Sequence, residues 1–109
     1  MFLQRYCFCT NWCHFVKVDV IIPAYNCEKT IGMSIGSILK QNPFVGTIII
    51  IDDCSTDKTR DVILEFQKTV DFILYKQNPQ NLGAGNSRNI GLKLSTSRYI
   101  SFLDSDDYW

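Results

Sequence analysis

The chain has 109 residues, enough for one modest domain, and 46% of them are hydrophobic against 20% charged, as in a globular protein with a real core. Eleven Lys and Arg side chains balance eleven Asp and Glu side chains. The chain therefore lacks the basic excess typical of nucleic-acid binding and the acidic tail typical of a disordered partner region. No apolar run approaches the roughly 18 residues that would span a membrane.

The first 16 residues, MFLQRYCFCTNWCHFV, differ in character from the rest of the chain. They contain four side chains of zinc-ligand type, namely Cys7, Cys9, Cys13 and His14. A second Cys/His pair at the usual spacing does not follow, which disfavours a zinc site. Gln4 and Arg5 interrupt the apolar stretch, which disfavours a signal peptide. We expect an irregular N-terminal extension, and cysteines without a disulfide framework suit a reducing cytoplasm.

The regular part of the chain begins at residue 17. The apolar run at 18–23 predicts a short strand, closed by Pro23. Residues 27–41 place apolar side chains on one face of a helix, at Ile31, Ile35, Ile38 and Leu39. Asn26 is the expected N-cap of that helix.

The β-branched run at 47–53 predicts a second strand. Ser55 or Thr56 is the expected cap of a second helix, whose inner face would carry Val62, Ile63, Phe66 and Val70. Cys27 and Cys54 are expected to be small buried residues.

The last third of the chain repeats this alternation. A strand at 72–75 is followed by a glycine turn at 81–85 and a short helix near 86–95, with Ile90 and Leu94 inward. The run at 99–103 predicts the fourth strand.

The order β-α-β-α-β-α-β, with strands that are continuous apolar runs, indicates a parallel sheet buried on both faces. In such α/β folds, ligands bind beyond the carboxyl ends of the strands. Polar residues follow every predicted strand here, at 23–26, 52–55, 77–88 and 104–106. The sequence therefore predicts a binding site at this edge of the sheet.

The residue types at that edge suit a nucleotide diphosphate. Tyr25 offers a flat face for a base, and Asp53 can accept from a ring N–H such as that of uracil. Asp104 can accept from a ribose hydroxyl, and Arg88 supplies a fixed cation. Asp106 can ligate Mg²⁺ or Mn²⁺, which would join the carboxylates to phosphate oxygens and neutralise charge on a departing diphosphate.

Four stretches, VDVIIPAYN, IIIIDDCSTDKT, NLGAGNSRNIGL and YISFLDSDDYW, together resemble the first half of a family 2 glycosyltransferase with the GT-A fold. The resemblance covers residues 17–109. It implies a Rossmann-like, nucleotide-diphospho-sugar-binding α/β half-domain of parallel βαβαβαβ order. It also implies a bacterial-type hexosyltransferase activity in cell-surface polysaccharide or glycolipid synthesis, with a UDP-sugar as donor.

The resemblance also implies roles for individual residues. The nucleotide would be held by Pro23, Ala24, Tyr25, Asn26, Asp53, Arg88, Asp104 and Ser105. Asp104-Ser105-Asp106 would be the D-x-D motif, with Asp106 and Asp104 on a divalent cation. It further implies a cytoplasmic location, with the full-length protein peripheral to the membrane.

Two departures from the family pattern affect these expectations. Cys54 stands where the family often has glycine, so a positive φ at this position would be strained. The D-x-D motif is followed by only three residues, so we expect the acceptor-binding half and the general base to be missing, and the chain alone to be inactive and prone to self-association. Asp107 is the one nearby spare carboxylate, and a turn role suits it better than a base role.

Three other hypotheses for the function of the chain stay open. In a haloacid-dehalogenase-type phosphatase, Asp104 would be the nucleophile and Asp106 the acid/base. In a dinucleotide-binding Rossmann domain, GAGNSR would have to be the phosphate loop, although it follows the third strand. The chain would otherwise be an inactive or accessory nucleotide-binding fragment.

Overall fold

The structure, a computed structural model, describes residues 17–41 and 43–109. In chain order the elements are β1 (Val18–Ala24), α2 (Ile31–Leu39), β2 (Val45–Asp52), α3 (Thr59–Gln67), β3 (Ile73–Gln77), α4 (Ala84–Leu94) and β4 (Tyr99–Phe102). The predicted order of elements is confirmed, although several bounds shift. The expected N-terminal extension and its zinc-ligand types lie outside the described residues. None of the helices in the described part has the length and apolar composition that crossing a bilayer requires.

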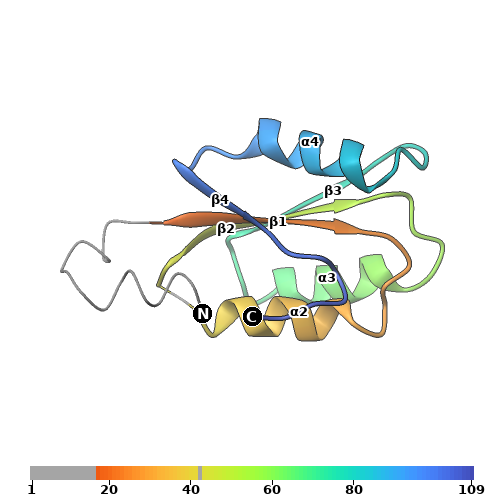
Figure 1. Cartoon of the computed structure of the whole chain (residues 1–109). Helices are drawn as coiled ribbons and strands as arrows, with labels where there is room; N and C mark the ends of the chain where they lie inside the picture. The colour runs from red at the N-terminus through yellow and green to blue at the C-terminus, as the bar shows by residue number, and fades with distance from the viewer. Residues whose placement is uncertain (1–16, 42) are drawn as a thin grey trace.

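All four strands form one parallel sheet, in the order β3-β2-β1-β4. Ala24 at the end of β1 pairs with Asp52, and Asp52 pairs in turn with Gln77 at the end of β3. On the other side, Ile21 pairs with Phe102 of β4. Helices α2 and α3 cover one face of the sheet and α4 covers the other (Figure 1). The predicted α/β class is confirmed, and the carboxyl ends of the strands meet at one edge.

The core has two parts because helices cover both faces of β1 and β2. The larger part faces α2 and α3, and its fully buried members include Val20, Ile22, Ile48, Ile50, Ile31, Ile35, Ile38 and Ile63. The smaller part faces α4 and consists of Ile21, Ile49 and Ile51, with Ile90 and Leu94 packed against them. The inward faces predicted for the helices are confirmed.

Helix α4 approaches the sheet closely at Gly91. A Cβ atom at this position would lie 2.5 Å from Cγ2 of Ile21. A larger residue would therefore push α4, and the residues that its first turn carries, away from the sheet.

The two edge strands are less buried than predicted. In β4, Tyr99, Ile100 and Phe102 are 50%, 37% and 46% exposed, and in β3 only Ile73 is buried. The prediction of strands buried on both faces is wrong for these two, because each has only one neighbouring strand. An exposed apolar edge strand favours pairing with another chain, so self-association stays a prediction.

Both predicted N-caps are wrong. Helix α2 begins at Ile31, with Thr30 as its N-cap, and α3 begins at Thr59, with Lys58 as its N-cap. Asn26 instead has φ 46°, and its side chain serves a neighbouring loop. A polar residue before a helical pattern is a cap only when the helix begins directly after it, and here each helix begins several residues later.

At the opposite edge of the sheet, one buried carboxylate joins three segments of the chain. Asp19 is 1% exposed, and it accepts hydrogen bonds from the backbone of Thr47 and from the hydroxyl groups of Ser95 and Ser97, at 2.9, 2.6 and 2.7 Å. The backbone N–H groups of Thr96 and Ser97 also donate to it. Burial raises the pKa of Asp19, but the hydrogen bonds from Ser95, Ser97 and Thr47 outweigh burial and hold the pKa below its usual value.

We expect Asp19→Asn to lower the free energy of unfolding at pH 7 by about 2–3 kcal/mol, because a buried group with charge-assisted hydrogen bonds loses its charge. A carboxyl whose folded pKa is depressed stabilises the fold above its unfolded pKa, and this stability is lost as the pH falls through the folded value. The deficit of the variant should therefore shrink below about pH 4. Urea titrations between pH 3 and 7 measure it, with the exposed Asp71→Asn as control. Equal losses in both variants would contradict the role given to Asp19.

Candidate functional site

One cavity of about 390 Å³ opens at the carboxyl edge of the sheet. It is lined by the ends of β1, β2 and β4, the loop after β1 and the first turns of α4, through Pro23, Ala24, Tyr25, Asn26, Cys27, Thr30, Asp53, Ala84, Ser87, Arg88, Asp104, Ser105 and Asp106. All nine residues that the sequence nominated for nucleotide or metal lie in this set. Their roles stay predictions, but the structure brings them together.

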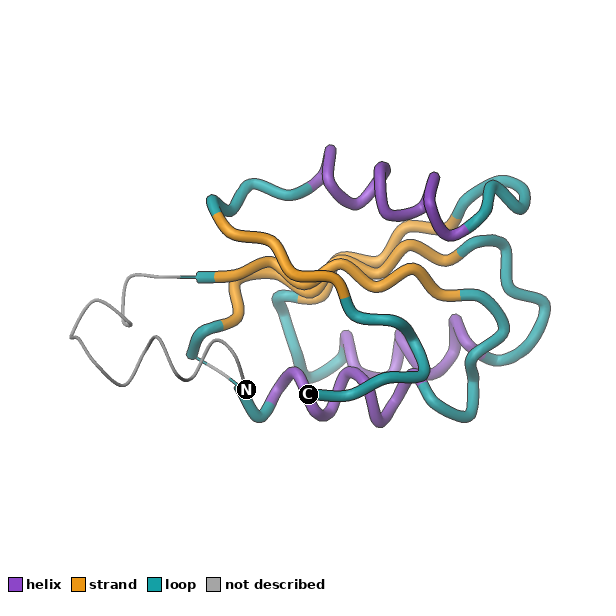
Figure 2. Tube along the Cα trace, in the orientation of Figure 1, coloured by secondary structure: helices purple, strands orange, loops and turns teal. Residues whose placement is uncertain are grey.

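The loops that follow β1 and β2 lie side by side (Figure 2) and are joined by side-chain hydrogen bonds. The side-chain oxygen of Asn26 accepts from the backbone N–H of Thr56 at 2.8 Å, and the Asn26 N–H donates to Oγ of Ser55 at 3.0 Å. One residue further on, the Cys27 N–H donates to Oγ1 of Thr59 at 2.8 Å. These bonds fix the loop that places Tyr25, 49% exposed, at the mouth of the cavity.

Asp53 holds the glycine turn before α4. Its carboxylate accepts from the backbone N–H groups of Leu82 and Gly83 at 2.7 and 3.0 Å, and from the side-chain amide of Asn78 at 3.0 Å. Burial raises the pKa of Asp53, but these three hydrogen bonds outweigh burial and lower the pKa below its usual value. Asp53 is therefore an anionic acceptor that both lines the cavity and orients the start of α4.

Asp52 has a separate role, as the alternation of strand side chains predicts. Its side chain is fully buried outside the cavity, accepting from the Tyr75 hydroxyl at 2.5 Å and the Ser55 N–H at 2.9 Å. Burial raises the pKa of Tyr75, and its hydrogen bond to Asp52 raises it further. The Tyr75 hydroxyl therefore stays protonated as a donor.

Cys54 has φ 64°, the left-handed region that glycine adopts without strain. The positive φ considered from the sequence is thus confirmed. Cys54 is only half-buried, whereas Cys27 is buried, and both thiols are free. Burial raises the pKa of the Cys27 thiol and is the largest of several influences on it, so Cys27 is a neutral group in the lining of the cavity.

Arg88 extends from α4 to the loop after β4. Its Nη2 lies 3.1 Å from Oδ1 of Asp104, and both side chains are partly exposed. An exposed ion pair contributes little to stability, but this one places a guanidinium beside the carboxylates. No pattern in the sequence predicts this pair.

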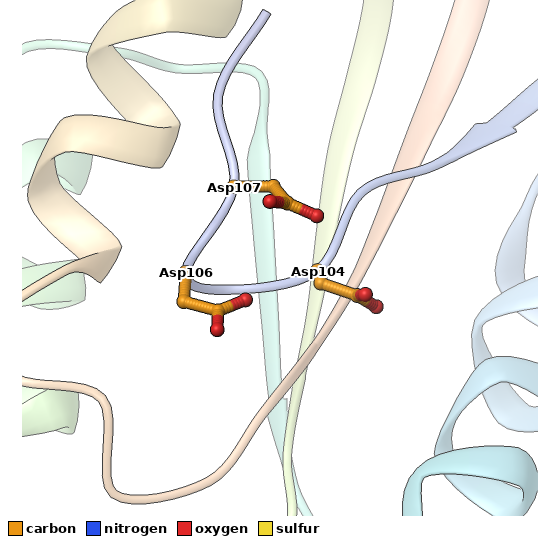
Figure 3. Close-up of side chains that lie close together, drawn as sticks. All are labelled: Asp104, Asp106 and Asp107. Atoms are coloured by element: carbon orange, nitrogen blue, oxygen red, sulfur yellow. The ribbon is translucent and has the colours of Figure 1, made fainter.

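Three carboxylates gather in the turn after β4, which we call the carboxylate turn (residues 104–107). One oxygen from each of Asp104, Asp106 and Asp107 lies within 4.8 Å of the other two, and Figure 3 shows the three side chains projecting from one bend of the chain. The Asp107 N–H donates to the Asp104 carbonyl at 2.9 Å, which supports the turn role expected for Asp107. Exposed carboxylate oxygens are ligands that Mg²⁺ and Mn²⁺ accept, so the donor set fits a hard divalent cation.

The sequence did not nominate four other lining residues, Cys27, Thr30, Ala84 and Ser87. Ala84 and Ser87 lie one turn apart at the start of α4, four and one residues before Arg88. Helical spacing around Arg88 could have predicted them. Cys27 and Thr30 depend on the path of the loop before α2, for which the sequence has no comparable signal.

Comparison with known proteins places this geometry in a family. Residues 19–109 match the sequence model of glycosyl transferase family 2. The chain is 44% identical over 92 residues to WfgD of Escherichia coli, a UDP-Glc:alpha-D-GlcNAc-diphosphoundecaprenol beta-1,3-glucosyltransferase, and this alignment covers 84% of the chain. The chain spans only 36% of that relative's length, and 39% of the length of another bacterial relative.

Solved structures agree in fold. The crystal structure of Staphylococcus aureus TarS 1–349 in complex with UDP-GlcNAc matches with a TM-score of 0.77 and 35% identity, over 85% of this chain and 27% of that one. A mannosyltransferase from Pyrobaculum calidifontis, solved with GDP-Man and Mn²⁺, matches with a TM-score of 0.79 over 98% of this chain and 34% of that one. Its identity is 20%, so this second likeness concerns the fold alone.

We expect Cys54→Gly to raise the free energy of unfolding by about 1 kcal/mol, because a left-handed conformation costs a residue with Cβ roughly that amount. Urea denaturation measures the change. Cys54→Ala is the matched control, since it removes the thiol but keeps Cβ. If alanine stabilised the fold as much as glycine, the thiol and not the backbone would be the cause.

Proposed function

The chain belongs to glycosyl transferase family 2, and from this premise we propose that it forms the donor-binding part of a glycosyltransferase. The donor is a nucleotide-diphospho-sugar, of UDP type, held with a divalent cation. The observation that carries the proposal is the convergence of Tyr25, Asp53, Arg88 and the carboxylate turn on one cavity. The family match argues against the phosphatase and dinucleotide-binding alternatives, since it extends over residues 19–109.

The base is proposed to lie against Tyr25 and Asp53. Both carboxylate oxygens of Asp53 already accept hydrogen bonds from the protein. A carboxylate has about four lone-pair sites, so a base N–H can still be accepted. Because the lowered pKa of Asp53 keeps it ionised, it favours uracil, whose N3 carries a proton, over cytosine, whose N3 does not.

The diphosphate is proposed to lie between α4 and the carboxylate turn. Arg88 and the first turn of α4, where Ala84 lines the cavity, present positive charge and backbone N–H groups to an anion. Asp106 and Asp104 would hold Mn²⁺ or Mg²⁺. The cation supplies charge neutralisation for the departing diphosphate, while Arg88 can transfer from Asp104 to a phosphate oxygen.

The relatives support a UDP-linked donor and a bacterial cell-surface role. The name of WfgD specifies a UDP-glucose donor and a diphosphoundecaprenol-linked acceptor, and TarS was solved with UDP-GlcNAc. We propose the same donor class for this chain, in cell-surface polysaccharide or glycolipid synthesis at the cytoplasmic face of the membrane. The sugar and the acceptor are not assigned. We also assign no general base, because the described residues in the cavity offer no carboxylate beyond those given to base, ribose and cation.

The cation has a direct test. We expect Mn²⁺ to strengthen UDP binding to the chain by at least about tenfold, or 1.4 kcal/mol, and this gain should disappear in Asp106→Asn. Isothermal calorimetry with and without a chelator measures it, and Asp61→Asn, exposed on α3, is the control. If neither the chelator nor Asp106→Asn changed the affinity for UDP, the cation's role would be contradicted. No UDP binding at all would contradict the proposed function.

The base pocket has a test of its own. We expect the wild-type chain to prefer UDP over CDP by about 1–3 kcal/mol, the range for a hydrogen bond to a charged group. Asp53→Asn should narrow this preference, because an amide can donate to N3 of cytosine. Asp52→Ala should lower stability but leave the preference unchanged, since Asp52 lies outside the cavity. An unchanged preference in Asp53→Asn would remove Asp53 from base recognition.

A further inference from the structure

We propose that Ser34 of α2 is a positioning residue for the carboxylate turn, and hence for the cation that the proposed function requires. The inference rests on that function for its consequence but on separate contacts for its evidence. Ser34 is fully buried, lies on no wall of the cavity, and was not nominated by the sequence.

The carboxylate turn has no support from the sheet. The last ladder bond of β4 runs from the Leu103 N–H to the Ile21 carbonyl at 3.1 Å. Beyond it, the chain crosses the sheet edge and lies along α2 (Figure 1). Within the turn the Asp107 N–H bonds the Asp104 carbonyl, which closes the turn but does not attach it to the rest of the fold.

Ser34 supplies a buried attachment, in addition to the partly exposed ion pair between Arg88 and Asp104. Its hydroxyl lies 2.9 Å from the carbonyl oxygen of Ser105, 71 residues away in sequence, and also contacts the carbonyl of Asp107. The carbonyl of Thr30, the usual partner of a serine within a helix, is further away at 3.3 Å. A hydroxyl has one proton to donate. The carbonyls of Ser105 and Asp107, on either side of Asp106, both lie nearer to it than the Thr30 carbonyl, so the hydroxyl is bonded to the turn.

The position of the Ser105 carbonyl makes this contact consequential. Ser105 lies between Asp104 and Asp106, and its carbonyl belongs to the same planar peptide unit as the N and Cα atoms of Asp106. Fixing this carbonyl therefore fixes where the Asp106 side chain begins. Ser34 acts on a proposed cation ligand through one rigid peptide unit.

A second serine on the same face of α2 fixes the end of the segment. Oγ of Ser37 accepts a hydrogen bond from the backbone N–H of Trp109 at 3.0 Å and donates one to the Ser34 carbonyl at 2.8 Å. The Trp109 side chain is half-buried and packs against the core. The turn is thus held on both sides of Asp106, by Ser34 and by Ser37.

This arrangement explains why two polar residues lie on the apolar face of α2. Ser34 and Ser37 lie among Ile31, Ile35 and Ile38, which are fully buried. A buried hydroxyl without a partner is unfavourable, and among the described residues every buried side-chain nitrogen and oxygen has one. Holding the turn before a cation binds removes the entropic cost of ordering it at that moment.

The test measures Mn²⁺ affinity in the presence of saturating UDP by electron paramagnetic resonance. Ser34→Ala should weaken Mn²⁺ binding about tenfold, the lower end of the range for partners that orient metal ligands. Ser34→Thr keeps a donor and should restore binding. Ile38→Val changes the same buried face of α2 but leaves the hydroxyl groups of Ser34 and Ser37 in place, so it should leave Mn²⁺ affinity unchanged. Asp106→Asn marks complete loss of the site.

A second measurement follows the turn without any cation. Trp12→Phe leaves Trp109 as the one tryptophan of the chain, and Ser34→Ala in that background should increase quenching of Trp109 fluorescence by acrylamide. If Asp106→Asn loses Mn²⁺ but Ser34→Ala binds it as the wild type does, the positioning role is overturned and the proposed function stands. An equal loss in Ile38→Val also overturns the role, because general destabilisation would then explain the effect. A wild-type chain that binds no Mn²⁺ with UDP overturns the proposed function, and the positioning role with it.

Discussion

Strand β1 forms parallel hydrogen bonds with both β2 and β4, and this pairing sets the positions of the helices and loops. It pairs Ala24 with Asp52, and Ile21 with Phe102, so the three strands run toward the same edge of the sheet. Residues that follow these strands, far apart in the sequence, therefore meet there. The same pairing buries β1 and β2 between two layers of helices. Burial of their continuous isoleucine runs provides the apolar area that stabilises the sheet, and the polar site then occupies the edge, where water has access.

Carboxylates and serine hydroxyl groups join the loops to this sheet. Asp19 holds the α4–β4 connection at the amino edge, and Asp53 holds the turn before α4 at the carboxyl edge. In both cases hydrogen bonds from backbone N–H groups satisfy a carboxylate and lower its pKa. Each loop is therefore held by a carboxylate that remains ionised at neutral pH. Ser34 and Ser37 do the same for the carboxylate turn with neutral groups.

Charges of both signs lie together at the cavity. Three exposed carboxylates within 4.8 Å repel one another, and Arg88 beside Asp104 relieves this only in part. A divalent cation with a nucleotide diphosphate would satisfy both signs at once. Asp52 and Asp53 are adjacent but differ in surroundings: Asp52 is buried against Tyr75, whereas Asp53 lines the cavity and also holds the turn before α4.

The order of elements, the parallel sheet and the edge at which the cavity opens could be predicted from the sequence alone, because apolar periodicity and the polar residues after each strand are local signals. All nine nominated residues line one cavity for this reason. The contacts of these residues, by contrast, became visible only in the folded chain. Asn26 was expected to cap α2, but it bonds a loop 30 residues away; Arg88 pairs with Asp104, and Ser34 reaches Ser105 across 71 residues. Such partners depend on the distance between each helix and the sheet and on where each loop turns. Neither can be read from the number of residues that separate two positions in the sequence.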